Sequence, residues 1–335
     1  MNPLANDLDY ILEQTAPLWE SLRNQRIFIT GGTGFFGCWL LESFLWANLK
    51  FKLNATAVVL TRNRDIFIKK WPHLCSSPFI TFHEGDTRNF LFPSGEFSHI
   101  IHAATDVSHP GDYESIVQGV RHVLAFSKAC HANKFLLTSS GAVYGKQPAD
   151  ILYLSEDMPF YDTHSAYALG KREAEKYCFL FSKQHNLQIK IARCFAFVGP
   201  YLPLNTHFAI GNFIRDGLAS QSITVNGNGT AYRSYMYAAD LMVWLWTILF
   251  RGEVARPYNV GSDHAINIAE LAEIIAGVFN PKLTVSIKQA LCLNLPAERY
   301  IPSIQRAKNE LGLNLHTNLI SAIQATINWQ QQCYQ

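Results

Sequence analysis

The stretch Arg26-Ile-Phe-Ile-Thr30-Gly-Gly-Thr-Gly-Phe-Phe-Gly37 decides the fold of this chain. Its first five residues form a short apolar run rich in β-branched side chains, which predicts a buried parallel strand. Gly31, Gly34 and Gly37 follow in the pattern G-x-x-G-x-x-G, and residues 38–47 predict a helix. Glycines at such a turn let the backbone approach a pyrophosphate at the helix N-terminus. The stretch therefore predicts a dinucleotide site, with a tight turn that binds nothing as the alternative.

Apolar runs that predict strands alternate with helical segments as far as about residue 193. They span residues 26–30, 55–60, 79–82, 99–103, 134–138 and 188–193. Such alternation indicates an α/β fold with a Rossmann-type, doubly wound parallel sheet. We expect a helical extension over residues 1–25, an NAD(P)-binding Rossmann domain over 26–193, and a smaller α/β substrate-binding domain over 194–335, interwoven with the first. In the smaller domain, 221–225 and 257–260 are expected to be strands.

A second feature is Tyr167-Ala-Leu-Gly-Lys171, preceded in the chain by Ser140. On a helix, residues i and i+4 share one face, so Lys171 is expected beside Tyr167. A nearby ammonium lowers the pKa of a phenol, which would suit Tyr167 to general acid/base catalysis. Ser140, at a strand end, completes a catalytic set for hydride transfer at a carbinol. The alternative is a surface helix with an ordinary Tyr and a solvated Lys.

The end of the second predicted strand bears on the choice of cofactor. An NAD site usually has Asp or Glu there, to bind the ribose 2′-hydroxyl. This chain has Thr61-Arg62-Asn63-Arg64 instead, and Arg62 suits a 2′-phosphate. The cofactor is therefore predicted to be NAD(P), with NADP(H) slightly favoured over NAD. Alternatively, Arg62 and Arg64 are solvated loop charges.

Composition excludes several classes of protein. The 335 residues are 48% hydrophobic and 16% charged, which is typical of a globular protein. A net charge of +2 gives no reason to expect nucleic acid. Seven scattered cysteines without a C-x-x-C pair, and twelve dispersed histidines, indicate no metal site and reduced, cytoplasmic thiols. The apolar run 241–250 is too short to span a membrane, which needs ~20 residues, and the N-terminus does not resemble a signal peptide.

Together with the glycine turn and the Tyr167/Lys171 pair, several further strings resemble the extended short-chain dehydrogenase/reductase family. This is the NAD-dependent epimerase/dehydratase family, whose members modify nucleotide sugars. The resemblance covers roughly residues 26–312. The strings are Gly85-Asp86, His102-Ala-Ala-Thr105, Ser139-Ser-Gly-Ala-Val-Tyr-Gly145, Arg193-Cys-Phe-Ala-Phe-Val-Gly-Pro200, Gly227-Asn-Gly-Thr-Ala-Tyr-Arg233, Tyr258-Asn-Val-Gly261 and Arg299.

The resemblance implies a set of site residues. Those for the cofactor are Gly31, Thr33, Gly34, Phe35, Phe36, Gly37, Arg62, Asp86, Ala103, Ala104, Thr105, Tyr167 and Lys171. Those for a nucleoside-diphosphate sugar are Ser140, Asn212, Arg233 and Arg299, the two arginines facing its diphosphate. The family also commonly dimerises through helices equivalent to those near 113–131 and 165–183, which implies a homodimer.

Two positions depart from the family pattern. Dehydratases that resemble this chain carry an acidic pair after the catalytic hydroxyl, where Gly141 and Ala142 stand here. The related decarboxylases tend to carry Glu at the position of Ala142. Ala196 replaces an Asn that contacts substrate in many members, and Asn212 is expected to serve instead. These departures favour a 4-epimerase or 4-ketoreductase acting at sugar C4. A 4,6-dehydratase or decarboxylase is the alternative, and a non-catalytic cofactor-binding regulator is the remote one.

Overall fold

A computed structural model describes residues 2–104, 113–206, 208–290 and 296–333. The chain forms two compact units. The first comprises Met1–Val143, Thr163–Cys194 and Met242–Tyr258, and the second comprises Tyr144–Asp162, Phe195–Leu241 and Asn259–Gln335.

The first unit is built on a seven-stranded sheet in the order β11-β6-β5-β4-β1-β2-β3. Its pairs from β3 through β6 run parallel. The strands are β1 (Arg26–Thr30), β2 (Thr56–Thr61), β3 (Ile80–Glu84), β4 (His99–His102), β5 (Lys134–Ser140), β6 (Gln188–Cys194) and β11 (Pro257–Val260). The run β3-β2-β1-β4-β5-β6 is the Rossmann order. The predicted fold class and its six strands are confirmed, with small shifts at the strand ends.

Residues 257–260 form the predicted strand, but in a different sheet from the one expected. They are β11, the edge strand beside β6, and the boundary between the two units falls within it, after Tyr258. Tyr258, Asn259 and Val260 in this strand are all buried. A strand covered on both sides is typical of a parallel sheet between helices, which explains where the run lies.

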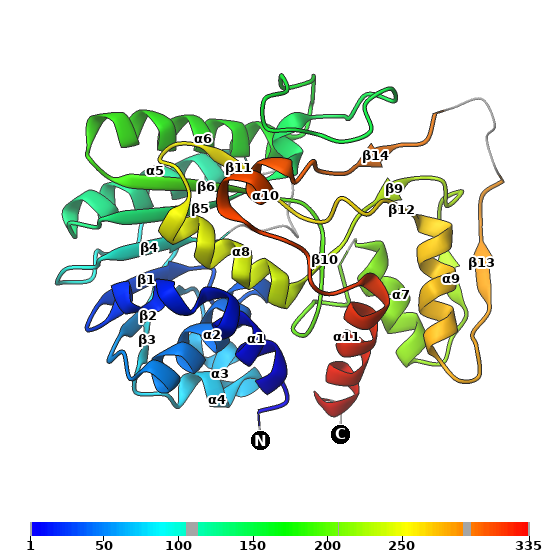
Figure 1. Ribbon diagram of the computed structural model, residues 1–335, viewed down its shortest axis with the longest axis horizontal. Helices are drawn as coiled ribbons and strands as arrows, with labels where there is room; N and C mark the ends of the chain where they lie inside the picture. Colours follow the sequence, from blue (N-terminus) through cyan, green and yellow to red (C-terminus); the bar gives the residue numbers. More distant parts are fainter. Residues whose placement is uncertain (1, 105–112, 207, 291–295, 334–335) are drawn as a thin grey trace. The chain divides into compact units, whose positions relative to one another are not determined.

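Helices surround this sheet, and α5 and α6 pack side by side, as Figure 1 shows. They are α1 (Ala5–Thr15), α2 (Phe35–Phe51), α3 (Arg64–Lys70), α4 (Pro72–Cys75), α5 (Tyr113–Ala129), α6 (Ala166–Gln184) and α8 (Ala238–Arg251), with 3₁₀ turns η1 (Ala16–Leu22) and η2 (Gly141–Tyr144). One core cluster joins the sheet to α5 and α6, with Phe28, Phe126 and Phe135 fully buried in it. No helix among the described residues is long and apolar enough to cross a membrane.

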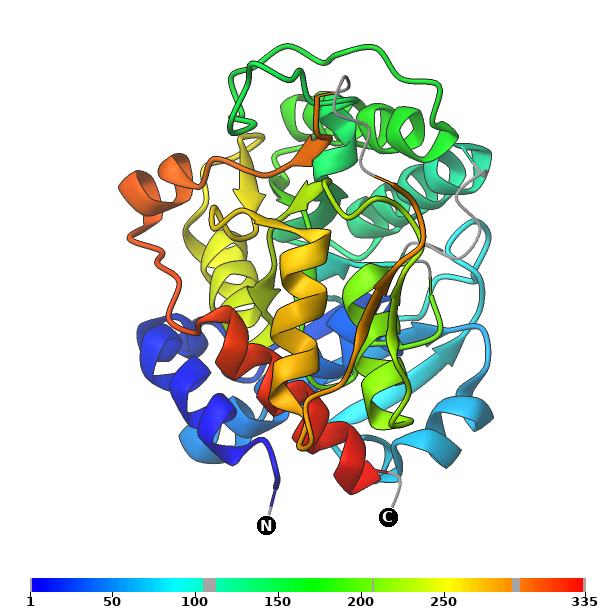
Figure 2. The same cartoon turned by 90° about the vertical axis from the view of Figure 1, so that its right-hand side faces the viewer.

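The described part of the second unit contains short strands and four helices. Its strands form the sheets β10-β7, β12-β9-β14 and β13-β8. They are β7 (Phe197–Val198), β8 (Ile223–Val225), β9 (Tyr232–Arg233), β10 (Met236–Tyr237), β12 (Ile266–Asn267), β13 (Val285–Ile287) and β14 (Arg299–Tyr300). The helices are α7 (Ala209–Leu218), α9 (Ile268–Val278), α10 (Gln305–Leu311) and α11 (Leu319–Cys333). Helix α9 lies beside α7 and α11 (Figure 2).

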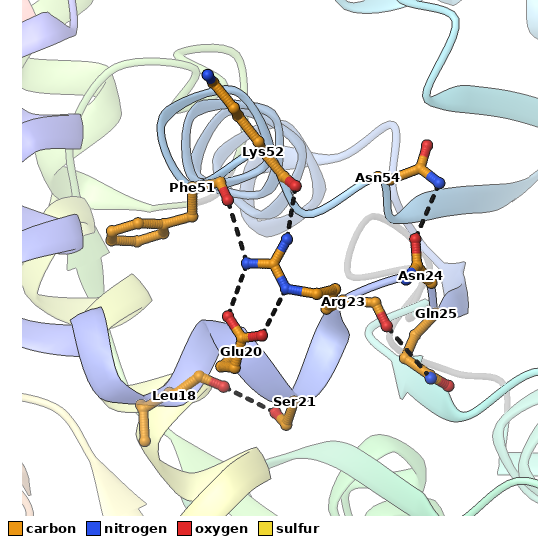
Figure 3. A network of polar contacts seen from close by, with 9 residues as sticks. All are labelled: Leu18, Glu20, Ser21, Arg23, Asn24, Gln25, Phe51, Lys52 and Asn54. Atoms are coloured by element: carbon orange, nitrogen blue, oxygen red, sulfur yellow. Dashed lines mark hydrogen bonds and ion pairs between the residues drawn. The ribbon is translucent and has the colours of Figure 1, made fainter.

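The N-terminal extension packs on the first unit. Its buried face includes Leu8, Ile11 and Trp19, and the Trp19 ring lies 4.7 Å from that of Trp246 on α8. Figure 3 shows how its end is fastened: the Arg23 guanidinium donates to the carbonyl oxygens of Lys52 (2.8 Å) and Phe51 (3.3 Å). These carbonyls belong to the end of α2, where helical carbonyls lack partners of their own. Glu20 accepts two hydrogen bonds from the same guanidinium and holds it in place.

Truncating Trp19 tests whether the extension is part of the core. Trp19→Ala should lower the free energy of unfolding by about 3–5 kcal/mol, because a fully buried indole leaves a cavity. Trp46→Ala, at a half-buried indole on α2, is the control and should cost clearly less. Denaturant unfolding measures both. Equal losses would show that residues 1–25 are only loosely attached.

A buried histidine predicts how stability depends on pH. Burial, helped by the charge of Lys134, lowers the pKa of His99 from 6.5 to about 4, and no described residue hydrogen-bonds its buried Nε2. Between these two pH values the unfolded chain binds a proton that the folded chain does not, so stability falls as pH falls. His99 should contribute about 1.4 kcal/mol per pH unit in this window.

His99→Phe should therefore flatten the acid side of the stability curve, measured as the free energy of unfolding from pH 7 to 4. His264→Phe, at an exposed histidine, is the control. An unchanged slope in His99→Phe would contradict the assignment.

Candidate active site

The glycine turn follows β1 and leaves no room for side chains. Gly31 has a φ of +72°, and a Cβ on it would lie 2.5 Å from the backbone of Ala103 and Ala104. A Cβ on Gly37 would lie 2.2 Å from Gly32. Helix α2 begins at Phe35, within this turn, and among the described residues no side chain caps it at Gly34. A helix N-terminus of this kind suits an anion such as the pyrophosphate of a dinucleotide.

The ends of β1 and β4 are fastened together beside this turn. Thr30 Oγ1 lies 2.7 Å from His102 Nδ1 and accepts a hydrogen bond from the Ala104 amide at 3.2 Å. Burial, and then the charge of Lys171, lower the pKa of His102 to about 3, so the imidazole is neutral. Of the predicted cofactor residues, Gly31 to Gly37 lie in this turn and Ala103 and Ala104 lie against it, whereas Thr105 falls outside the described residues.

Arg62 and Asp86 lie close enough to interact. The Asp86 carboxylate accepts hydrogen bonds from the amide, Nε and Nη2 of Arg88. These bonds chiefly, with a contribution from the Arg62 charge, lower the pKa of Asp86. The sequence analysis missed Arg88, although its position two residues after Asp86 is a signal for this local pair.

Helix α6 and the end of β5 bring together the three predicted catalytic residues. Ser165 begins the helix, its Oγ accepting from the Ala168 amide. The Ser140 hydroxyl lies close enough to the Tyr167 phenol to lower its pKa, and it accepts a hydrogen bond from the Ala142 amide at 3.1 Å. Lys171, buried one turn after Tyr167, places its Nζ 5.9 Å from the centre of the Tyr167 ring.

The pKa of Tyr167 departs from the expectation. Burial raises it above the ordinary value of 10, and the Ser140 hydroxyl offsets only part of this rise. Burial also lowers the pKa of Lys171 to about 8. The Lys171 ammonium donates to the Thr138 carbonyl oxygen at 2.8 Å. In the chain alone, desolvation therefore outweighs the lowering of the Tyr167 pKa that was expected from the Lys171 charge.

In the second unit, Arg233 and Arg299 occupy the neighbouring parallel strands β9 and β14. Tyr232 contacts both: its carbonyl oxygen accepts from Arg233 at 2.8 Å, and the Arg299 guanidinium lies 4.6 Å above its ring. Among the described residues, the buried Arg299 Nε has no hydrogen-bond partner. Two adjacent guanidiniums with a spare donor suit a doubly charged ligand.

Asn212 lies on α7, where its side chain accepts a hydrogen bond from Arg215 at 3.0 Å. It lines a polar hollow of about 370 Å³ with residues that include Thr224, Asn226 and Lys288. No hydrogen bond in the described part of the chain joins it to Arg233 or Arg299. Nor do the described residues include three His, Cys, Asp or Glu side chains grouped to hold a metal.

Comparison with known proteins bears on the family. Residues 27–261 match the model of the NAD dependent epimerase/dehydratase family. UDP-glucuronic acid decarboxylases 5 and 6 of Arabidopsis thaliana are 29% and 30% identical to this chain, each match covering 86% of this chain and 84% of the relative. The crystal structure of a UDP-glucuronic acid 4-epimerase from Bacillus cereus in complex with NAD has the same fold. It is 20% identical, with a TM-score of 0.77 over 92% of this chain and 100% of that one. The resemblance stated from the motifs is confirmed, and the chain belongs to the NAD-dependent epimerase/dehydratase family.

Proposed function

We propose that this chain is a nucleotide-sugar 4-epimerase or 4-ketoreductase that moves a hydride at sugar C4. The observation that carries the proposal is the placing of the Ser140 hydroxyl beside the Tyr167 phenol, with Lys171 buried one helical turn away and its Nζ 5.9 Å from the centre of the Tyr167 ring. Ser140 ends β5, a strand of the same sheet whose β1 leads into the glycine turn. A proton-transferring phenol at the end of such a sheet is what oxidation of a carbinol needs.

In the proposed reaction, Tyr167 takes the proton of the C4 hydroxyl as its oxygen becomes a carbonyl, and returns it in the reverse step. The Ser140 hydroxyl hydrogen-bonds that same oxygen. Lys171 holds the nicotinamide ribose and, while charged, favours the Tyr167 phenolate. NAD(P), when bound, supplies the hydride acceptor and donor. The crowded glycine turn and the uncapped start of α2 fit its pyrophosphate.

The turn after Ser140 supports redox chemistry at C4 over elimination. Gly141 and Ala142 begin the 3₁₀ turn η2, and neither side chain can transfer a proton. Dehydration across C5–C6 needs an acid and a base there, so a 4,6-dehydratase is disfavoured. Decarboxylation of a nucleotide-linked uronic acid is the second candidate, because the two plant relatives carry that name. It would begin with the same oxidation at C4.

The substrate is proposed to be a nucleoside-diphosphate sugar whose diphosphate binds Arg233 and Arg299. Support comes from their adjacency in the sheet β12-β9-β14 and from the unpaired Arg299 Nε. Arg guanidiniums bind phosphate oxygens in pairs of hydrogen bonds. Asn212 is proposed as a further substrate contact, because it lines a polar hollow in the same unit.

We propose a cytoplasmic homodimer that slightly prefers NADP(H). Arg62 supports the cofactor preference, since its charge reaches the strand end where a ribose 2′-phosphate would bind. Leu169, Phe179 and Leu180 on α6 are exposed, which supports a partner helix on that face. Free thiols at all six described cysteines suit a reducing compartment.

Replacing the phenol tests catalysis. Tyr167→Phe should lower turnover of UDP-glucose, UDP-glucuronic acid or the derived 4-keto sugar by at least about 100-fold, because the proton acceptor is lost. Cofactor should remain bound. Tyr177→Phe, on the same helix, is the matched control. Retained turnover in Tyr167→Phe would refute its role, and the absence of any turnover in the unaltered protein would favour the regulator alternative.

Mass spectrometry of the nucleotide released on denaturation tests the cofactor. Retained NAD at one per chain would indicate an epimerase or another redox-neutral enzyme. Retained NADP(H), or a site that accepts NADPH from solution, would indicate a ketoreductase that uses Arg62. In that second case Arg62→Ser should weaken NADPH binding roughly 10-fold or more and leave NADH binding nearly unchanged, since only NADPH carries the 2′-phosphate.

A further inference from the structure

Three consecutive residues at the end of β5 contact three successive turns of α6. The pairs are Thr138 with Lys171, Ser139 with Glu175, and Ser140 with Tyr167. The first and third pairs involve the proposed catalytic groups. The second pair has no place in the proposed reaction, although Ser139 stands between the two β5 residues of the other pairs.

Glu175 is the centre of a buried polar cluster. Its Oε1 accepts from Ser139 Oγ at 2.5 Å and from Arg193 Nε at 3.0 Å, and its Oε2 accepts from Arg193 Nη2 at 2.8 Å. All three residues are at most 7% exposed. Ser139 and Arg193 are register partners in β5 and β6. One carboxylate therefore joins α6 to both strands.

Such a cluster is costly to bury. Removing a carboxylate and a guanidinium from water costs several kcal/mol per ion, and apolar side chains of similar volume often serve stability as well. The cluster must therefore do more than fill space. Its bonds are directional, and they fix how far α6 stands from the strand that carries Ser140.

We propose that Glu175 is a positioning residue for proton transfer, which through Ser139 and Arg193 holds α6 against β5 so that the Ser140 hydroxyl stays beside the Tyr167 phenol. The inference rests on the proposed function, because it assigns Tyr167 as the proton acceptor. Glu175 is not proposed as a catalytic residue. Among the described residues, its carboxylate contacts neither the Tyr167 phenol nor the glycine turn.

The Ser140 hydroxyl acts on the ionisation of the phenol. It lowers the pKa of Tyr167 against the rise caused by burial and by Cys194. The titratable and charged groups nearby lie on three elements: Lys171, Glu175 and Cys178 on α6, Arg193 and Cys194 on β6, and His102 on β4. Strand β5 supplies only hydroxyls and carbonyls at this end. Loosening α6 from β5 should therefore raise the pKa of Tyr167.

The experiment is a pH titration of the full chain with saturating NAD⁺ and ¹³Cζ-labelled tyrosine, followed by NMR. The spectrum of Tyr167→Phe identifies the Tyr167 signal. Glu175→Gln replaces one acceptor oxygen by a donor that faces Arg193. It should raise the midpoint of the Tyr167 titration by about one pH unit, because the Ser140 hydroxyl would then stabilise the Tyr167 phenolate less. A hydrogen bond to a charged group contributes free energy of that order. Ser139→Ala removes one bond only, and should shift the midpoint less in the same direction.

Two controls separate positioning from stability. Ser43→Ala removes a buried hydroxyl that accepts from Trp246 elsewhere in the first unit; it should lower Tm but leave the midpoint in place. The double variant Glu175→Met with Arg193→Met should recover Tm, since an apolar pair replaces the ions, but should keep the raised midpoint. A midpoint unchanged in Glu175→Gln, or one that recovers with Tm in the double variant, would overturn the proposal.

The titration does not depend on turnover, so the two proposals can fail separately. Full activity in Tyr167→Phe would remove the proposed function, whatever the titration shows. Loss of activity in Tyr167→Phe with no shift in Glu175→Gln and Ser139→Ala would remove only the role of Glu175.

Discussion

The close approach of the glycine turn to the end of β4 is the constraint on which the rest of the site depends. Gly31 and Gly37 each leave less space than a single methyl group needs, because backbone of Ala103 or Gly32 already occupies it. This approach aligns the start of α2 with the ends of β1 and β4, and Thr30 and His102 fasten the alignment. The turn can then present uncapped N–H groups to a pyrophosphate. A larger residue at either glycine would separate the elements that form the cofactor cradle.

Strand β5 carries the chemistry onto this frame. Its last residues contact α6 at successive positions, so the proposed acid/base group and the lysine behind it are held by a sheet that is buried on both faces. Burial also sets the electrostatics. It makes the phenol harder to ionise and the ammonium easier to deprotonate. The chain alone therefore leaves Tyr167 as a poor base, and a positive charge beside it is what the reaction requires.

Much of the fold followed from the sequence, because buried parallel strands are runs of apolar residues such as Arg26–Thr30 and Gln188–Cys194. The Tyr167/Lys171 spacing and the position of Ser140 also sufficed to predict that these three side chains lie close together, as they do in the structure. Two kinds of feature could not be read in this way. The partner of Arg193, Glu175 on α6, is set by tertiary contact, which no local period encodes. Residues 257–260 read as a strand, but pairing with β6 depends on helix α8 returning the chain to the first unit.

The N-terminal extension has a consequence for observing the protein. Trp19 and Trp246 lie with ring centres 4.7 Å apart and planes inclined by 55°. Two indoles this close and this steeply tilted couple their electronic transitions, so the pair should give a strong near-ultraviolet circular dichroism signal. That signal would show in solution, and without a label, whether the N-terminal extension is packed against α8. The Trp19–Trp246 pair is thus an intrinsic spectroscopic probe of the extension.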